Sequence, residues 1–276
     1  MNLHRRWLSL GFALLLAGCA GLGTSTSATS SNTTLIKPDA VTRTALAPTG
    51  TLRVGVYPGS PTSLVRNPKT GDAAGVALKL GEALGQRLGT PVQVVEFNRL
   101  ALVLNALKAG TLDFTFTNAT EARARDMDFT APLIQLELGY LVPPASRISQ
   151  VAEVDRAGVR VGVSQGSSSQ TALARDFKSA SLHPAASLQQ AQAILRQGQI
   201  DAFATNKGIL FEMASELPDY RVLDGRWGLE NLAIAVPQGR SAAAPYLRQF
   251  AQEVRASGLL QSLITCAGLR GTAQAN

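Results

Sequence analysis

Asp113 to Pro132 read DFTFTNATEARARDMDFTAP, the stretch from which the rest of the fold can be worked out. Apolar and polar side chains alternate at its start, which predicts a β-strand over residues 112–117. Polar turn residues follow, and Arg123 comes six residues after the strand. An arginine can bind a carboxylate through two parallel hydrogen bonds, so we expect an anion-binding edge here. On spacing alone Arg125 is an equal candidate, and pairing with nearby acidic residues on the surface is the alternative.

Strand and helix patterns alternate on both sides of this stretch. Short apolar runs mark buried strands, and apolar residues at helical spacing, closed by glycine or proline, mark helices. We expect strands over residues 52–57, 92–97, 112–117, 136–142, 159–163, 200–205 and 231–236, with helices over about 76–88, 100–108, 168–177, 187–197 and 207–217 and two more at the C-terminus. This order predicts an α/β fold with mainly parallel sheets flanked by helices and ligands beyond the carboxyl ends of the strands.

The composition is that of a folded globular protein, with 45% hydrophobic and 16% charged residues among 276. The net charge of +7 comes from scattered basic residues, which favours a solvated basic surface over a nucleic-acid partner. Two cysteines and two histidines predict neither a disulfide framework nor a metal site, and Cys266 is expected as a small core residue. The motifs HExxH, GxSxG, GxxxxGK and CxxC are absent, so no cofactor and no catalytic residue is assigned.

The N-terminus is expected to be a targeting segment rather than part of the fold. Basic residues precede an apolar run that is shorter than the roughly 20 residues of a membrane-spanning helix, as in a secretory signal. The run ends in LAGC, which resembles the lipobox of bacterial lipoproteins, and that resemblance implies lipidation of Cys19. We expect a lipoprotein signal peptide over residues 1–19 and a flexible polar tether over 20–48, with a plain signal peptide as the alternative.

Further polar residues follow other predicted strands. In the sequence QGSSS over residues 165–169 a strand end meets a helix start, where N–H groups and serine hydroxyls either hold an anion or simply cap the helix. Asn206 follows another strand and is either a turn residue or a ligand contact. Tyr57, Asn98 and Arg99 lie beyond the first two strands and can line the same opening.

Six segments, taken in order, carry a family resemblance. They are GTLRVGV from Gly50, LNALKAGTLDF from Leu104, TEARARDMDFTAP from Thr120, VRVGVSQGSS from Val159, GQIDAF from Gly198 and LAIAVPQG from Leu232. Over about residues 50–269 the chain resembles the periplasmic solute-binding proteins of ABC importers, in the group that binds polar amino acids. The resemblance implies a two-lobed type II periplasmic-binding-protein fold joined by two crossing strands. The first lobe would comprise residues 49–136 and 231–276, and the second lobe residues 137–230.

The same resemblance implies a set of ligand contacts. In the family, the arginine of a T-x-x-R signature binds the ligand α-carboxylate, and this role falls on Arg123 rather than Arg125. Small residues of the glycine turn in the second lobe contact the same carboxylate, which implies Gly166, Ser167 and Ser168.

Two departures from the family pattern bear on the ligand. The segment before Arg123 is shorter than usual, so Thr117 and Asn118 stand where a glycine and a hydroxyl residue are customary. The acidic partner of the ligand α-ammonium group aligns with Asn206, and an amide lacks the full negative charge that pairs with an ammonium. We therefore expect a carboxylate ligand that lacks an α-ammonium group or finds its acidic partner elsewhere.

The resemblance implies a monomeric, non-enzymatic lipoprotein in the periplasm or another extracytoplasmic space, held to a membrane by its lipid. It would capture a small carboxylate-bearing ligand, an amino acid or related organic acid, by hinge closure and deliver it to an ABC permease. One alternative is a dehydratase-like enzyme on the same fold, which requires Glu96, Glu137 or Glu230 to point into the cleft beside Arg123. The other alternative is a sensory lipoprotein without transport.

Overall fold

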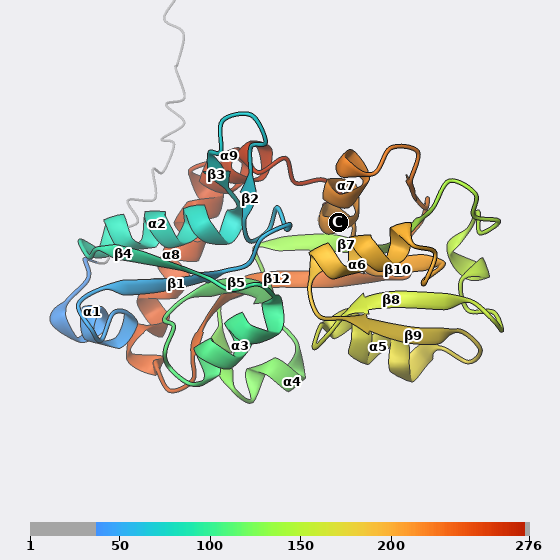
Figure 1. Ribbon diagram of the computed structural model, residues 1–276. Coiled ribbons are helices and arrows are strands. Elements are labelled where there is room, and N and C mark those ends of the chain that lie inside the picture. Colours follow the sequence, from blue (N-terminus) through green and yellow to red (C-terminus); the bar gives the residue numbers. More distant parts are fainter. Residues whose placement is uncertain (1–36, 274–276) are drawn as a thin grey trace, which may run out of the picture. The chain divides into compact units, whose positions relative to one another are not determined.

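Two long strands, β7 (Ile134–Val142) and β12 (Gly228–Pro237), run through the middle of the computed structural model, which describes residues 37–273 (Figure 1). They pair antiparallel, residues 228–232 opposite 134–138. The predicted signal peptide, the lipidation of Cys19 and the tether up to residue 36 lie outside the described residues. Within residues 37–273, no helix has the length and apolar character needed to cross a bilayer.

The first lobe contains the elements before β7 and after β12. Val54 and Phe114 form a parallel bridge that connects β1 to the segment leading into β5, and β1 also pairs in parallel with β4. Leu80, Leu84 and Leu88 recur every four residues, so they form one buried face of α2, which packs on β1. The elements are α1 (Ala40–Leu46), β1 (Leu52–Val56), β2 (Val65–Arg66), β3 (Ala73–Ala74), α2 (Val76–Leu88), β4 (Val92–Glu96), α3 (Leu100–Lys108), β5 (Thr115–Asn118), α4 (Glu121–Ala124), β6 (Met127–Phe129), η2 (Ser241–Ala243), α8 (Ala244–Ala256) and α9 (Leu259–Cys266).

The second lobe contains the elements between β7 and β12. Strand β8 pairs in parallel with β9 and β10, and β10 pairs antiparallel with β7. Since β12 also pairs with β5, one sheet passes through both lobes in the order β5-β12-β7-β10-β8-β9, with β6 beside β12 and β11 beside β7. The elements are η1 (Val151–Glu153), β8 (Arg160–Ser164), α5 (Ser168–Asp176), β9 (Ser181–Ala185), α6 (Leu188–Arg196), β10 (Ala202–Asn206), α7 (Lys207–Glu216) and β11 (Arg221–Val222).

The two lobes repeat one ion pair at corresponding places. In the first lobe, Arg53 at the start of β1 donates to Asp113 at 2.7 and 2.8 Å and to a glycine carbonyl. In the second lobe, Arg160 at the start of β8 donates to Asp201 at 3.0 and 2.7 Å and again to a glycine carbonyl. The Asp113 side chain is fully buried and accepts a further bond from Arg240, whereas the Asp201 side chain is 35% exposed. Each pair ties the first strand of a lobe to the segment that precedes a neighbouring strand.

Part of the segment predicted to be a flexible tether forms helix α1. The Oδ1 of Asp39 caps the helix by accepting from the Thr42 N–H at 2.7 Å, and Leu46 is fully buried in the core of the first lobe. Arg240 also donates to the Leu46 carbonyl. The prediction of a flexible tether over 20–48 is therefore wrong for residues 40–46, which are part of the fold.

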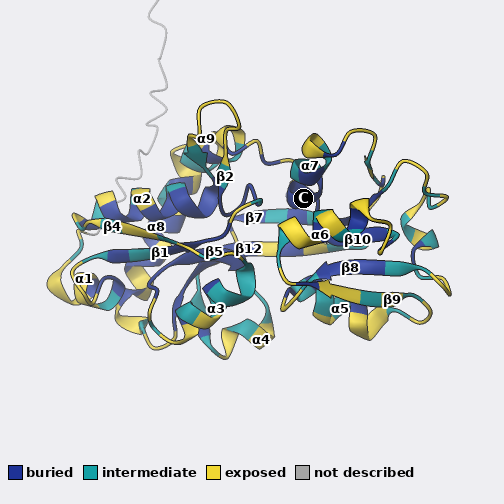
Figure 2. Ribbon diagram, viewed as in Figure 1, coloured by how far each residue is buried: buried dark blue, intermediate teal, exposed yellow. Residues whose placement is uncertain are grey.

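Two smaller expectations also fail. Cys266 is exposed on α9 rather than packed in the core. Strand β9 was not predicted, because Pro184 in its middle is unfavourable in a sheet interior; β9 lies at the sheet edge, where proline is tolerated. Figure 2 shows the buried residues gathered in strands such as β8 and along α2, with exposed residues on the outer sides of the helices.

Candidate ligand-binding site

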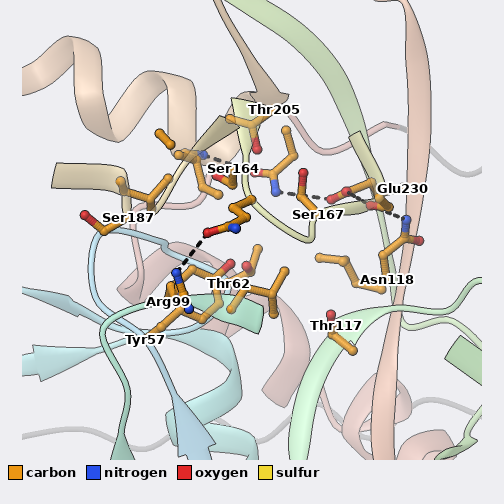
Figure 3. Close-up of a pocket in the computed structure, with 18 of the residues that line it drawn as sticks. Tyr57, Thr62, Arg99, Thr117, Asn118, Ser164, Ser167, Ser187, Thr205 and Glu230 are labelled. Atoms are coloured by element: carbon orange, nitrogen blue, oxygen red, sulfur yellow. Dashed lines mark hydrogen bonds between the residues drawn. The ribbon is translucent and has the colours of Figure 1, made fainter. Parts of the chain in front are cut away.

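A cavity lies where strand ends and helix starts of the two lobes come together (Figure 3). The atom-free space within it, including the part open to solvent, is about 620 Å³, and about 40 Å³ of it can hold the centre of a water-sized sphere, so the cavity is narrow. From the first lobe and β12 it is lined by Tyr57, Thr62, Arg99, Leu100, Phe116, Thr117, Asn118, Arg123, Glu230 and Leu232. From the second lobe it is lined by Ser164, Gln165, Ser167, Ser168, Ala185, Ala186, Ser187, Leu188, Thr205, Asn206 and Ile209.

Four helices begin at this cavity, which is why its potential favours anions. Ser167, Ser187 and Asn206 are the N-caps of α5, α6 and α7, and each side-chain oxygen accepts a backbone N–H of the first turn at 3.1 Å. Arg99 is the N-cap of α3, where no side-chain cap forms. The N-terminal end of a helix carries a partial positive charge, so the four ends together raise the potential inside the cavity.

Arg123 lies on α4, whose N-cap Thr120 fixes the start of the short helix. Its Nη1 donates to Thr117 Oγ1 at 2.9 Å and to the Asn118 carbonyl at 3.1 Å. Its Nη2 is buried without an acceptor, and within residues 37–273 it has no ion-pair partner. Burial lowers the pKa of Arg123, and the charge of Glu230 opposes that shift. A guanidinium that lines a cavity and keeps a buried donor without an acceptor is suited to binding an anion.

Glu230 supplies the only carboxylate among the described residues of the lining. It lies on β12 and is 7% exposed. Ser168 Oγ donates to Oε1 at 2.8 Å, and Asn206 Nδ2 donates to Oε2 at 3.1 Å. In the part of the chain that the structure describes, no cation lies within 4.0 Å of it. Each oxygen has room for a further donor, so this carboxylate can accept hydrogen bonds from a cationic group of a ligand.

Two hydrogen bonds join the lobes across the cavity. Asn118 Nδ2 of the first lobe donates to Ser168 Oγ of the second at 3.2 Å. Arg99 Nη1 donates to Gln165 Oε1 at 2.9 Å (Figure 3). These contacts hold the cavity in a closed arrangement, as in a hinged protein whose lobes meet over a ligand.

Seven of the eight predicted ligand contacts line this one cavity. They are Tyr57, Thr117, Asn118, Arg123, Ser167, Ser168 and Asn206. The eighth, Gly166, lies outside the lining in an adjoining groove, and its N–H donates to Gln170 Oε1 at 2.7 Å. Burial raises the pKa of the Tyr57 hydroxyl, although hydrogen bonds with the neighbouring hydroxyls of Ser60 and Thr62 oppose the shift.

The other candidate residues divide into those that line the cavity and those that do not. Arg125 and Asn98 are exposed and do not line the cavity, whereas Arg99 does. Glu96 accepts from Arg66 on the surface, and Glu137 accepts from Lys207 and Arg226, so Glu230 alone of the three glutamates reaches the cavity. Residues 37–273 contain no cluster of three or more His, Cys, Asp or Glu side chains that could hold a metal ion.

Four polar lining residues were not predicted from the sequence. They are Thr62, Ser164, Ser187 and Thr205. Ser164 and Thr205 lie at or next to strand ends, so the rule that found Asn206 could have found them. Thr62 lies in an irregular loop after β1, and no local pattern marks it as a ligand contact.

A cavity between two α/β lobes, joined by paired strands and lined by a half-buried arginine that has no ion-pair partner in residues 37–273, defines a two-lobed ligand-binding protein. The chain belongs to the bacterial extracellular solute-binding proteins, family 3, whose profile matches residues 52–265. The family membership and the type II fold expected from the sequence are both confirmed.

Curated relatives and solved structures agree with this assignment. The chain is 24% identical over 255 residues, 91% of each chain, to the ABC transporter glutamine-binding protein GlnH of Bacillus subtilis (strain 168). It is 25% identical over 239 residues to a glutamine-binding protein of Geobacillus stearothermophilus, covering 83% of this chain and 90% of the relative.

Solved structures share the fold. One is the amino acid ABC transporter substrate-binding protein AbpA from Streptococcus pneumoniae Canada MDR_19A bound to L-arginine, with a TM-score of 0.72, 20% identity and coverage of 81% of this chain and 96% of that one. Another is the ancestral amino acid-binding protein AncCDT-1, a precursor of cyclohexadienyl dehydratase, with a TM-score of 0.68, 22% identity and coverage of 78% and 94%.

Proposed function

We propose that this solute-binding protein captures a small carboxylate-bearing ligand, an amino acid or related organic acid, and delivers it to an ABC permease. The observation that carries the proposal is that Arg123 lines the cavity and that its buried Nη2 has no acceptor in residues 37–273. A ligand carboxylate would receive a charge-assisted hydrogen bond there. Asn118 and the N-terminal end of α5 at Ser167 and Ser168 would help hold the same group.

Glu230 is the group that we propose binds an ammonium group of the ligand. The sequence places an amide, Asn206, where an acidic partner of an α-ammonium group is expected. Glu230 accepts a hydrogen bond from that amide and has no ion-pair partner within the described chain. A carboxylate and a guanidinium in one cavity, each without an ion-pair partner, suit a zwitterion whose two charged groups bind them separately.

The contacts across the cavity support a mechanism of hinge closure. A ligand would bind first to the lobe that carries Arg123, and the second lobe would then close over it through Ser168 and Gln165. Binding energy drives closure only if the ligand contacts the closed form better than the open form. A permease would recognise the closed form. The protein would act as a monomer in an extracytoplasmic space, held to the membrane through lipidated Cys19.

A dehydratase-like enzyme is the second candidate, because Glu230 meets its requirement for a glutamate in the cavity with Arg123. The likeness to AncCDT-1 shows a shared fold and no more. Prolonged incubation with cyclohexadienyl and other hydroxylated acids, followed by nuclear magnetic resonance, separates the two functions. Turnover that is lost in Glu230→Gln would establish the enzyme, whereas unchanged substrate that binds reversibly supports transport.

Isothermal titration with a panel of amino acids and small organic acids tests the proposed function. We expect at least one micromolar ligand, whose affinity falls by at least about tenfold in Arg123→Ala because a charge-assisted hydrogen bond is lost. Arg125→Ala is the matched control, since it removes an exposed arginine two positions away that does not line the cavity. Full affinity in Arg123→Ala would remove the basis of the proposal.

A further inference from the structure

We propose that Arg99 forms a second anion-binding subsite in the cavity, so that the ligand is an α-amino acid with an anionic side chain. This inference rests on the proposed function, in which Arg123 binds the α-carboxylate and Glu230 the α-ammonium group. It goes further because it names the side-chain chemistry of the ligand. The solved structure cited above holds L-arginine, which carries the opposite side-chain charge.

The first argument for this subsite is the balance of positive and negative charges in the cavity lining. The described lining contains two guanidinium groups, Arg99 and Arg123, and one carboxylate, Glu230. None of the three has an ion-pair partner within 4.0 Å in residues 37–273. A zwitterion bound to Arg123 and Glu230 leaves the charge of Arg99 unbalanced, and a side-chain carboxylate on the ligand balances it. A cationic side chain would add to the imbalance, which is unfavourable because like charges repel each other.

The free hydrogen-bonding capacity of Arg99 is the second step. Its Nη1 donates to the neutral amide oxygen of Gln165, while its Nε is buried without an acceptor in the described chain. A guanidinium has five N–H donors, and a buried donor left unpaired is costly. Arg99 therefore retains donors for a carboxylate, and a neutral amide contact leaves its charge uncompensated.

The position of Arg99 is the third step. Figure 3 shows Arg99 and Ser187 on one side of the cavity, and Glu230 and Asn118 on the other. Ser187 caps α6, whose N-terminal end lines the cavity, so a partial positive charge adds to that of Arg99. The site thus has an anion-favouring end separate from the end where Glu230 lies. A ligand with its α-groups at one end would extend its side chain toward the other.

A different role for Arg99 predicts a different result. The bond to Gln165 joins the two lobes, so Arg99 could serve only to hold the closed form. A residue that only stabilises closure changes the affinity of every ligand by the same factor. A residue that binds a side-chain carboxylate changes the ratio between an acid and its amide.

The test is titration calorimetry of the ligand-free protein with matched pairs, L-glutamate against L-glutamine and L-aspartate against L-asparagine. We expect the acidic member of at least one pair to bind at least about tenfold more tightly, since a hydrogen bond between two charged groups is replaced by a weaker one. In Arg99→Gln that preference should disappear. Arg66→Gln is the control, because it removes an exposed positive charge of the same lobe away from the cavity and should keep the preference.

The remaining outcomes overturn the inference in distinguishable ways. If the amide member binds equally well or better, or if Arg99→Gln weakens both members by the same factor, Arg99 does not read a side-chain anion. If none of the four amino acids binds while another organic acid binds through Arg123, this inference fails and the proposed function stands. If loss of Arg123 has no effect on any ligand, the proposed function itself fails.

Discussion

Asn206 Nδ2 donates to Glu230 Oε2 at 3.1 Å, which places a neutral amide and a buried carboxylate side by side at the cavity. The two residues come from different strands, β10 and β12, so their proximity is a product of the fold. Asn206 also caps α7 through its Oδ1, and it therefore serves both the helix and the glutamate. Asn206 carries no negative charge, but Glu230, which accepts its hydrogen bond, does.

Replacing Glu230 with glutamine should separate two kinds of ligand. The variant keeps the shape of the side chain and removes its charge, so binding of a ligand with an α-ammonium group should weaken by about 10- to 100-fold, the value of a hydrogen bond between charged groups. The des-amino analogue of the same ligand should change much less. Calorimetry with both compounds measures the difference. Equal losses for the two compounds would show that Glu230 does not bind the ammonium group.

Asp113 and Asp201 form equivalent ion pairs in the two lobes, and replacing each of them tests how burial affects the stability that such a pair contributes. Asp113→Asn removes the charge of a fully buried carboxylate that pairs with two mostly buried arginines, and we expect the unfolding free energy to fall by about 3–5 kcal/mol. Asp201→Asn breaks the corresponding pair in the second lobe, where the side chain is 35% exposed, and should cost only about 1 kcal/mol. Urea unfolding followed by circular dichroism measures both. A larger loss in Asp201→Asn would contradict the assignment of burial as the cause.

The ion pairs of Asp113 also predict how the stability of the fold depends on pH. Burial alone would raise the pKa of Asp113, but hydrogen bonds from Arg53 and Arg240 outweigh it and hold the pKa below its ordinary value of 3.8. A carboxyl whose pKa is lower in the folded state stabilises the fold fully above its unfolded value and loses that effect as pH falls through the folded value. The stability difference between wild type and Asp113→Asn should therefore be constant near neutral pH and shrink below about pH 4. A difference that grows on acidification would contradict this sign.

Much of the fold could be predicted because its elements carry local patterns. Helix α2 shows leucines every four residues, and β1 and β8 show the short apolar runs LRVGV and RVGV. Among the elements that were not predicted, two escaped because tertiary contacts outweigh their local signals. Strand β9 contains Pro184 and forms only as the partner of β8, and α1 lies in a Ser- and Thr-rich stretch and is held by burial of Leu46.

The site was predictable only in part for a similar reason. Arg123 follows β5 along the chain and Asn206 is the last residue of β10, so strand-end reasoning together with the family pattern selects them. Glu230 lies inside β12, and only the pairing of the crossing strands shows which of its residues faces the cavity. The sequence placed Glu230 among three candidate glutamates, and the structure separates it from the other two.

Leu46 and Val41 test whether α1 is part of the folded core. Leu46→Ala removes a fully buried side chain from the first lobe and should lower the unfolding free energy by about 2–5 kcal/mol. Val41 lies on the same helix but is 61% exposed, so Val41→Ala should change stability by no more than about 0.5 kcal/mol. Thermal and urea unfolding of the two variants measure the contrast. Similar stability of both would mean that the helix does not contribute to the core.

The proposed lipid anchor predicts how the protein divides between membrane and soluble fractions. Cys19→Ala removes the only thiol of the LAGC segment, so the protein should no longer incorporate labelled fatty acid and should move from the membrane fraction to the soluble fraction. Ligand affinity should stay within the error of the measurement, because residues 52–265 match the family and contain the whole cavity lining. Cys266→Ala is the matched control, since it removes the other cysteine, which is exposed on α9, and should leave fractionation and labelling intact. Labelling that survives in Cys19→Ala would place the lipid elsewhere, and a wild type without labelling would show that the apolar run is a plain signal peptide.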